Sequence, residues 1–255
     1  MARVTLISFT PDPEKTVAAA AKLCYSAQPV EGLLDGLTED KTADFLSMLA
    51  EIGHESPIEH ASFTFAIEGV SRSFLAQITR HRIASYSVQS QRYVRLGAFE
   101  YVTPPEIEAH PEAKAIYEES MRAAQERYDR LTQILKDKHL KELEAKGETG
   151  KAAGRKAEKK AIEDARFVLP NACATRMIVT MNARSLQNFF RHRCCFRAQW
   201  EIRAVAEEML RLAKGAAPHL FAQSGPPCVS GPCPEGKMSC GRAAEVRRAY
   251  LGGEA

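Results

Sequence analysis

Apolar residues recur along the chain with two different spacings. Residues 62–67 alternate between apolar and polar side chains, which predicts a half-buried strand. The short β-branched run at 4–9 predicts a second strand. Between them, apolar residues three to four positions apart predict a helix that begins after Thr38 and ends at Gly53. The first third of the chain therefore mixes strands and helices.

Helical spacing dominates the second half of the chain. Apolar residues three to five positions apart predict a long amphipathic helix over about 111–145. The basic, glycine-containing stretch 147–161 predicts a mobile loop or a frayed helical connection rather than a nucleic-acid arm. The same reasoning predicts a helix over 161–168, a strand over 176–181 and helices over 184–193 and 198–214. Few strands among many helices indicate an α+β or α/β fold in one domain.

Composition narrows the class of protein only slightly. The chain has 255 residues, 45% hydrophobic and 26% charged, with a net charge of +3 that identifies no partner. No apolar run approaches the roughly 20 residues of a membrane span, and the start of the chain lacks a signal peptide's apolar stretch. We therefore expect a cytoplasmic protein. We also expect its seven cysteines to be reduced.

The densest cluster of polar side chains runs from Gln77 to Arg92. Ser71 is expected to cap the apolar helix that leads into this cluster. Gln77, Arg80 and His81 lie at i, i+3 and i+4, so their side chains should meet on the last turn of that helix. Arginine forks followed by serines suit a phosphate, so an anionic nucleotide would fit. The alternative is a basic surface whose arginines pair with acidic helices.

A second polar cluster spans 182–193. Arg184 and Asn188 share a helix face, and Asn182 stands where a predicted strand gives way to a helix N-terminus, which attracts anions. The alternative is an ordinary solvated helix end. If both clusters are functional, the two basic segments could face a common cleft.

Familiar catalytic motifs are absent from the sequence. It contains no GxSxG elbow, phosphate-binding Walker loop, HExxH or GxGxxG. The tail cysteines, Cys228, Cys233 and Cys240, stand in a turn-rich segment without an obvious base, which is a poor setting for a catalytic thiolate. Their spacing also lacks the paired short intervals of zinc sites, so we expect no bound metal. The chemistry is expected to belong to a bound cofactor.

The segment RHRIASYSVQS, residues 80–90, resembles the signature of the flavin-dependent thymidylate synthases, in which RHR is followed after seven residues by Ser. HESPIEH before it, SQRY after it and the block ARFVLPNACATRMIVTMNARSLQNFFRHRCCFRAQWE are also similar to that family. The resemblance covers about 40–105 and 160–215, far more than a lone motif. It implies an α+β fold with a central, mostly antiparallel sheet flanked by helices and a long helical excursion.

The resemblance also implies a reaction. Members of the family convert dUMP to dTMP, taking a methylene from methylenetetrahydrofolate and a hydride from FAD that NADPH has reduced. They add no protein nucleophile to the uracil, which agrees with the missing motifs. The resemblance further implies a homotetramer whose active sites draw on several subunits. The organisation expected here is one catalytic domain over 1–225, followed by a Gly/Pro/Cys-containing tail over 226–255.

The family's binding positions can be carried onto this chain residue by residue. Nucleotide contacts then fall on Gln77, Arg80, Val88, Gln89, Ser90, Gln91, Arg92, Arg166 and Arg193. Flavin contacts fall on Ser56, Arg80, His81, Arg82, Ile83, Val88, Asn182, Ala183, Arg184 and Asn188, with His54 on the flavin or folate side. We expect Arg193 to be catalytic, because a guanidinium beside the uracil carbonyls would stabilise negative charge developing around N3. Ser90 is expected to donate to the nucleotide, since no adjacent base is evident.

Two positions depart from the family's pattern. Val88 stands where members often carry an acidic or amide residue, so a side-chain contact is lost there or replaced by backbone. Arg197 stands where some relatives have histidine, which puts folate or flavin contacts from that position in doubt.

Two other classes of function compete with the enzyme. A nucleic-acid-binding module would use the basic clusters on a phosphate backbone and would bind with a steep salt dependence. An α-helical interaction protein would dock a partner on the helix at 111–145 and would bind no cofactor. We expect neither nucleic acid nor a membrane among the partners of this chain.

Overall fold

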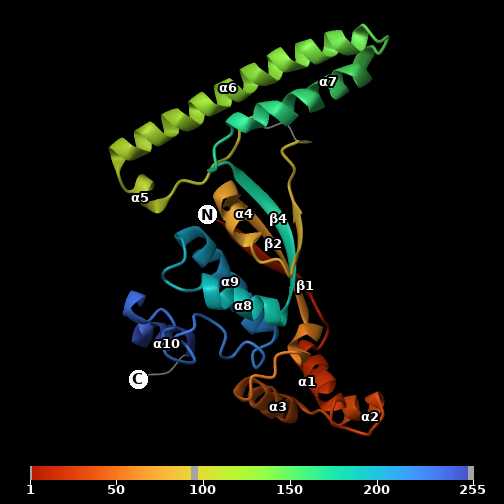
Figure 1. Cartoon of the computed structure of the whole chain (residues 1–255), viewed down its shortest axis with the longest axis vertical. Helices are drawn as coiled ribbons and strands as arrows, with labels where there is room; N and C mark the ends of the chain where they lie inside the picture. Colours follow the sequence, from red (N-terminus) through yellow and green to blue (C-terminus); the bar gives the residue numbers. More distant parts are fainter. Residues whose placement is uncertain (1, 93–96, 252–255) are drawn as a thin grey trace. The chain divides into compact units, whose positions relative to one another are not determined.

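The computed structural model of the chain describes residues 2–92 and 97–251 (Figure 1). The chain divides into two compact units. The hairpin unit comprises Glu68–Ala76 and Val88–Met177, and the cleft unit comprises Ala2–Ile67, Gln77–Ser87 and Ile178–Ala255. None of the described helices is both long enough and apolar enough to cross a membrane.

Four strands form an antiparallel sheet in the described part of the chain. Their order across the sheet is β1 (Arg3–Phe9), β2 (Ser62–Ser71), β4 (Ala174–Asn182) and β3 (Ser85–Val88). The strands predicted at 4–9, 62–67 and 176–181 are confirmed as parts of β1, β2 and β4. In the short strand β3, with the sequence SYSV, only Tyr86 and Val88 share the half-buried face, which is too short a pattern to predict a strand. With its helices, this sheet confirms the α+β class.

An aromatic core holds the cleft unit together. Phe63, which is fully buried on β2, meets the ring of Phe221 edge-on with 5.2 Å between ring centroids. Phe221 in turn contacts Phe190 of α8 (Ala183–Arg193), at 6.0 Å. Burial of large aromatic rings dominates the energetics of such cores. The side chains that alternate inward on β2 therefore fix α8 against the sheet.

Several helices belong to the cleft unit, and those at 39–51, 183–193 and 200–216 lie close to where the sequence predicts helices. They are α1 (Pro13–Leu23), α2 (Val30–Asp35), α3 (Glu39–Glu51), η1 (Pro57–His60), α8, α9 (Trp200–Ala216), η3 (Gly236–Met238) and α10 (Ala243–Leu251). Thr38 caps α3 by accepting a hydrogen bond from the Lys41 N–H at 3.4 Å. Gly53 follows with φ of 68°, a left-handed conformation that glycine adopts readily. The helices predicted over 184–193 and 198–214 are confirmed as α8 and α9.

Two helices that lie side by side dominate the hairpin unit (Figure 1). Its helices are α5 (Pro105–Glu108), α6 (Pro111–Glu144), α7 (Gly150–Ala165) and η2 (Arg166–Val168). The long helix predicted over 111–145 is confirmed as α6. Of the two alternatives for 147–161, a mobile loop or a helical connection, the structure shows a helix, because α7 begins at Gly150.

The helix α7 forms because a stripe of alanines along one face packs against α6. Ala153, Ala157 and Ala161 are buried and lie four positions apart, so they share one face of the helix. Leu143 of α6 packs against two of them, Ala153 and Ala157. The small methyl side chains allow the two helices to approach closely. Alanine is only weakly hydrophobic, so the stripe stands out little among the lysines and glycines around it. The stripe is therefore easily overlooked in the sequence.

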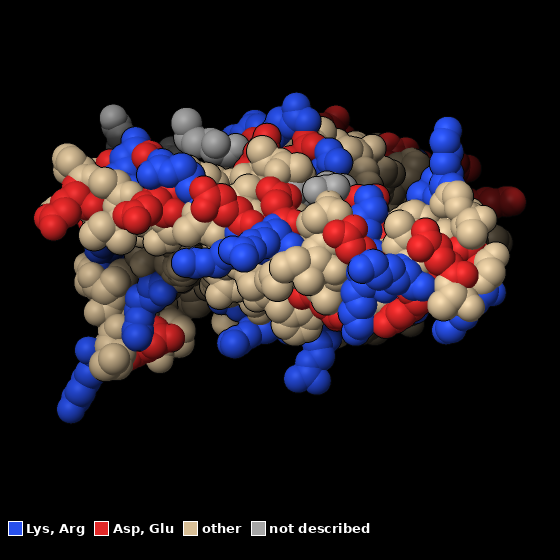
Figure 2. All heavy atoms as spheres, turned by 90° about the horizontal axis from the view of Figure 1, so that it is seen from above, with Lys and Arg blue, Asp and Glu red and all other residues tan. Residues whose placement is uncertain are grey.

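Acidic and basic side chains are interspersed on the face that Figure 2 shows. On the hairpin, Lys136 of α6 pairs with Glu158 of α7 at 3.4 Å, and Lys156 pairs with Glu148. Nucleic-acid-binding surfaces instead gather cations on one face. The basic stretch 147–161 thus forms part of a mixed-charge helical surface.

Candidate functional site

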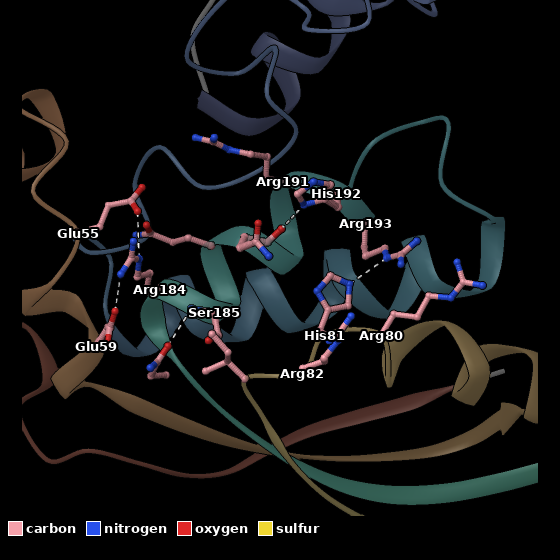
Figure 3. Close-up of a pocket in the computed structure, with 14 residues that line it drawn as sticks. Glu55, Glu59, Arg80, His81, Arg82, Arg184, Ser185, Arg191, His192 and Arg193 are labelled. Carbon is pink, nitrogen blue, oxygen red and sulfur yellow. Dashed lines mark hydrogen bonds and ion pairs between the residues drawn. The ribbon is translucent and has the colours of Figure 1, made fainter.

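A cleft with a volume of about 980 Å³ opens in the cleft unit, between the turn that follows α4 (Arg72–Ile78) and helix α8 (Figure 3). It is lined by Glu55, Glu59, Arg80, His81, Arg82, Ile83, Asn182, Arg184, Ser185, Gln187, Asn188, Arg191, His192 and Arg193. Residues from both polar clusters of the sequence contribute to it. The two basic segments therefore do face a common cleft.

The turn that carries Arg80 is held by backbone and by one tyrosine. The helix α4 ends at Ile78, so the prediction that Arg80 and His81 lie on its last turn is wrong. Their N–H groups instead donate to the carbonyls of Gln77 and Ile78, at 3.4 and 3.1 Å. The Tyr86 hydroxyl lies 2.7 Å from the Ile78 carbonyl and 2.8 Å from that of His81. This shared hydroxyl ties β3 to the turn.

Gln77 does not line the cleft. Its side-chain Nε2 donates to Oε1 of Gln199 at 3.5 Å, and the same Gln199 oxygen caps α9 by accepting from the N–H groups of Glu201 and Ile202. The amide of Gln77 is therefore directed to the start of α9 in this structure.

Inside the cleft, Arg193 forms a hydrogen bond with His81. The Arg193 Nε–H donates to Nε2 of His81 at 3.1 Å, so the imidazole must be neutral and must carry its proton on Nδ1. Burial, followed by the nearby Arg193 and His192, lowers the pKa of His81 to about 4. The ring also packs edge-on against Phe189, with centroids 4.9 Å apart. A neutral, fixed imidazole thus orients the guanidinium of Arg193.

Two guanidinium groups stand near each other without a carboxylate between them. Burial lowers the pKa of Arg193, and the positive charge of Arg80 lowers it further. In Figure 3 both side chains extend in the same direction from the His81 contact. Within residues 2–92 and 97–251, neither arginine forms an ion pair with an acidic residue. An anionic ligand would relieve this repulsion, which favours a binding site over a surface of ordinary ion pairs.

The N-terminus of α8 forms another wall of the cleft. Asn182 caps the helix, its Oδ1 accepting from the Ser185 N–H at 2.8 Å. Arg184 is committed to acidic partners: its Nε lies 3.1 Å from Glu55 and its Nη1 lies 2.5 Å from Glu59. Ala183, between Asn182 and Arg184, is fully buried and is not among the residues that line the cleft. An anion at this wall would therefore have to compete with two carboxylates for Arg184.

Several lining residues were not among the predicted contacts. They are Glu55, Glu59, Ser185, Gln187, Arg191 and His192. Arg191 and His192 belong to the second polar cluster, and Glu55 and Glu59 stand in the HESPIEH loop. The sequence does not predict that Glu55 and Glu59 line the cleft, because no local pattern indicates that their loop reaches Arg184.

Other predicted contacts lie in the hairpin unit. They are Val88, Gln89, Ser90, Gln91, Arg92 and Arg166. Arg92 pairs with Glu163 at 2.6 Å, and Arg166 donates from Nε to the Glu163 carbonyl at 3.0 Å. The Ser90 hydroxyl accepts from the Arg92 N–H at 3.1 Å. Within this unit, Arg92 and Arg166 are thus gathered around one acidic residue.

His54 and Ser56 interact with each other rather than with the main cleft. The Ser56 hydroxyl lies 3.2 Å from Nε2 of His54. His54 lines a smaller cavity of about 190 Å³, which Glu55 and Arg191 also border. Because these two residues border both cavities, His54 lies next to the cleft without facing it.

The tail belongs to the cleft unit and contacts Arg197. This arginine donates from Nη1 to Glu235 at 2.7 Å and to the Met238 carbonyl at 2.8 Å. Cys228 packs with Val229 and with Val246 of α10. All seven cysteines are free thiols. Within the described residues, no group of three or more His, Cys, Asp or Glu side chains is placed to hold a metal ion.

Comparison with known proteins extends over both units. The sequence profile of the family described as "Thymidylate synthase complementing protein" matches residues 5–219. The flavin-dependent thymidylate synthase of Clostridium tetani is 57% identical over 249 residues, which cover 98% of this chain and 97% of that protein. The protein of the same name from Geobacter sulfurreducens is 48% identical over 250 residues, covering 97% of each. The one from Pyrococcus furiosus is 38% identical over 240 residues, covering 92% and 90%.

Proposed function

The chain belongs to the family of flavin-dependent thymidylate synthases, and on that premise we propose that it methylates dUMP to dTMP. In the full proposal, the cofactor is FAD, the carbon donor is methylenetetrahydrofolate and the reductant is NADPH. The observation that carries the proposal is the cleft itself, where a neutral His81 orients Arg193 beside Arg80, which has no acidic partner within the described residues. No feature of the described residues supports either competing class as well.

The donors that line the cleft fit a flavin nucleotide. Cationic and amide side chains face it from two elements, and its volume of about 980 Å³ is within the usual range for cofactor pockets. The residues proposed to hold FAD are Ser56, Arg80, His81, Arg82, Ile83, Val88, Asn182, Ala183, Arg184 and Asn188. When bound, the flavin supplies the hydride that the methyl group requires. Arg184 would leave Glu55 and Glu59 to meet the diphosphate.

The substrate is proposed to lie against the arginines. The residues proposed to contact dUMP are Gln77, Arg80, Val88, Gln89, Ser90, Gln91, Arg92, Arg166 and Arg193. Arg193 is cationic at neutral pH, because a guanidinium is not deprotonated in proteins. Beside the uracil carbonyls it would stabilise negative charge around N3, which raises the nucleophilicity of C5. His81 would hold the guanidinium in place through Nε2 without adding a charge.

The cysteines of the chain support a reaction without a protein nucleophile. No thiol stands among the described residues that line the cleft. Cys194 follows Arg193 directly, but it is buried, and burial raises the pKa of its thiol. A protonated thiol is a poor nucleophile. Uracil activation is therefore assigned to charge stabilisation by Arg193.

Three further properties belong to the proposal. We propose a cytoplasmic homotetramer with active sites shared between subunits, and one catalytic domain over 1–225 followed by the tail. Size-exclusion chromatography with light scattering would test the oligomer, and a stable monomer with full activity would contradict it.

The decisive experiment uses the purified chain. After incubation with FAD and desalting, we expect a yellow protein whose flavin absorbance bleaches with NADPH under anaerobic conditions. When methylenetetrahydrofolate and dUMP labelled with tritium at C5 are added, the release of tritium should measure dTMP formation. A colourless protein that takes up no FAD contradicts the proposal. Salt-dependent binding of DNA by such a protein would favour the nucleic-acid-binding class instead.

A further inference from the structure

The segment Val88–Arg92 is fastened within the hairpin unit at three points. The Gln89 N–H donates to the Arg176 carbonyl at 3.0 Å, which continues the pairing of β3 with β4. The Gln91 side chain donates from Nε2 to Sγ of Cys173 at 3.7 Å. The third contact comes from Arg72, whose Nη2 donates to the Gln89 carbonyl at 3.1 Å.

Arg72 is itself firmly placed. It is the first residue of α4, directly after Ser71, whose hydroxyl accepts from the Phe74 N–H at 3.0 Å. Its own backbone N–H donates to the Cys173 carbonyl at 3.2 Å. Arg72 therefore links the start of a capped helix to the residue that also receives Gln91. Its side chain crosses from this anchor to Gln89.

Within the described residues, the guanidinium of Arg72 forms no ion pair. The side chain is half-buried, and within the described residues it has no acidic partner. Its Nε is buried and has no hydrogen-bond acceptor among the residues that the structure describes. The positive charge of Arg166 lies close enough to lower the pKa of Arg72, after the larger effect of burial. A buried donor without a partner costs free energy, which offsets part of the stabilisation that the contact with the Gln89 carbonyl provides.

We propose that Arg72 is a positioning residue for nucleotide binding, which sets the path of the Ser90–Arg92 segment by holding the Gln89 carbonyl. Holding this carbonyl orients the peptide that follows it, and therefore the direction in which Ser90 and Arg92 leave β3. The inference rests on the proposed function, because these residues are the proposed dUMP contacts. Arg72 acts through Gln89 and is not assigned a contact with the substrate.

The test replaces the guanidinium while keeping the stem of the side chain. Arg72→Met retains apolar packing and removes both the Gln89 contact and the unpartnered Nε. We expect the KM for dUMP to rise about tenfold, as for loss of one charge-assisted hydrogen bond. The KM for methylenetetrahydrofolate, the flavin content and Tm should stay at wild-type values. Arg72→Lys, which can still donate to the carbonyl, should recover part of the dUMP affinity.

Arg122→Met is the matched control, since Arg122 is exposed on α6 in the same unit. An Arg72→Met protein with the wild-type KM for dUMP overturns the inference alone. A fall in Tm together with equal losses for dUMP, folate and flavin also overturns it, because that result indicates a structural role. If the wild-type protein forms no dTMP, the proposed function fails first and the inference falls with it. Should Arg72→Met not fold, Arg72→Lys with wild-type Tm and unchanged dUMP affinity is the contradicting result.

Discussion

Arg193 donates its Nε–H to Nε2 of His81 across 3.1 Å, and this contact joins two positions that lie 112 residues apart. The histidine comes from the RHR signature, and the arginine ends helix α8. Because the acceptor nitrogen must be unprotonated, the contact exists only while the imidazole is neutral. The orientation of the proposed catalytic guanidinium is therefore coupled to the protonation of His81.

This coupling predicts a pH dependence of stability. Folding lowers the pKa of His81 from 6.5 to about 4. As the pH falls from 6.5 toward 4, this histidine therefore takes up a proton in the unfolded chain but stays neutral in the folded one. The stabilising contribution is fully present above pH 6.5 and is lost as the pH falls toward 4. Between pH 7 and pH 4.5 we expect the free energy of unfolding to fall by about 1–2 kcal/mol. This figure is smaller than the full pKa shift would give, because the ring is partly exposed. Urea unfolding at both pH values should show a smaller loss in His81→Asn. Equal pH slopes in the two proteins would exclude this assignment.

Removal of the guanidinium should separate catalysis from cofactor binding. In Arg193→Ala we expect dTMP formation to fall at least about 100-fold, as for loss of one preorganised charge in an active site. Flavin content should stay within about a factor of two of wild type, because the cofactor is proposed to use other residues. Arg211→Ala, on the exposed face of α9, is the control. Equal loss of flavin and of dTMP formation would reassign Arg193 to cofactor binding.

The ion pairs of Arg184 predict a gain of function. Glu59 lies 2.5 Å from Arg184 and lines the cleft, so it competes with an anionic ligand. We expect Glu59→Gln to tighten FAD binding about threefold, in keeping with the modest energy of an exposed pair. Quenching of FAD fluorescence would measure the affinity. Glu51→Gln, which makes the same charge change outside the cleft, should leave it unaltered. Weaker FAD binding in Glu59→Gln would indicate that Glu59 supports the site.

Tyr86 should contribute to stability through the turn that carries Arg80. Its hydroxyl serves the carbonyls of both Ile78 and His81, and burial raises its pKa to about 12. In Tyr86→Phe these carbonyls lose their donor, so the free energy of unfolding should fall by about 1–2 kcal/mol. Urea unfolding at pH 7 measures this change. Tyr25→Phe, where the ring is 81% exposed, should be neutral. A stable Tyr86→Phe protein would show that water replaces the hydroxyl.

Much of the fold follows from patterns that are local in the sequence. The alternation at 62–67, the cap at Thr38 and the long stripe of α6 each depend on residues within one or two turns of each other. The prediction failed where the local signal was weak. The alanines of α7 differ little in hydrophobicity from the residues around them, and β3 has only Tyr86 and Val88 on its half-buried face. Both elements depend on a partner, which is α6 in one case and β4 in the other.

The site shows the same division. The residue types that could bind an anion, and the family signature that they form, were determined by the sequence alone, because composition and spacing are properties of the chain. Only the tertiary structure decided their pairing. Arg184 meets Glu59 across 125 positions, and His81 meets Arg193 across 112, through the way in which α8 packs beside the loops. Such contacts depend on packing and strand register, which no local pattern encodes.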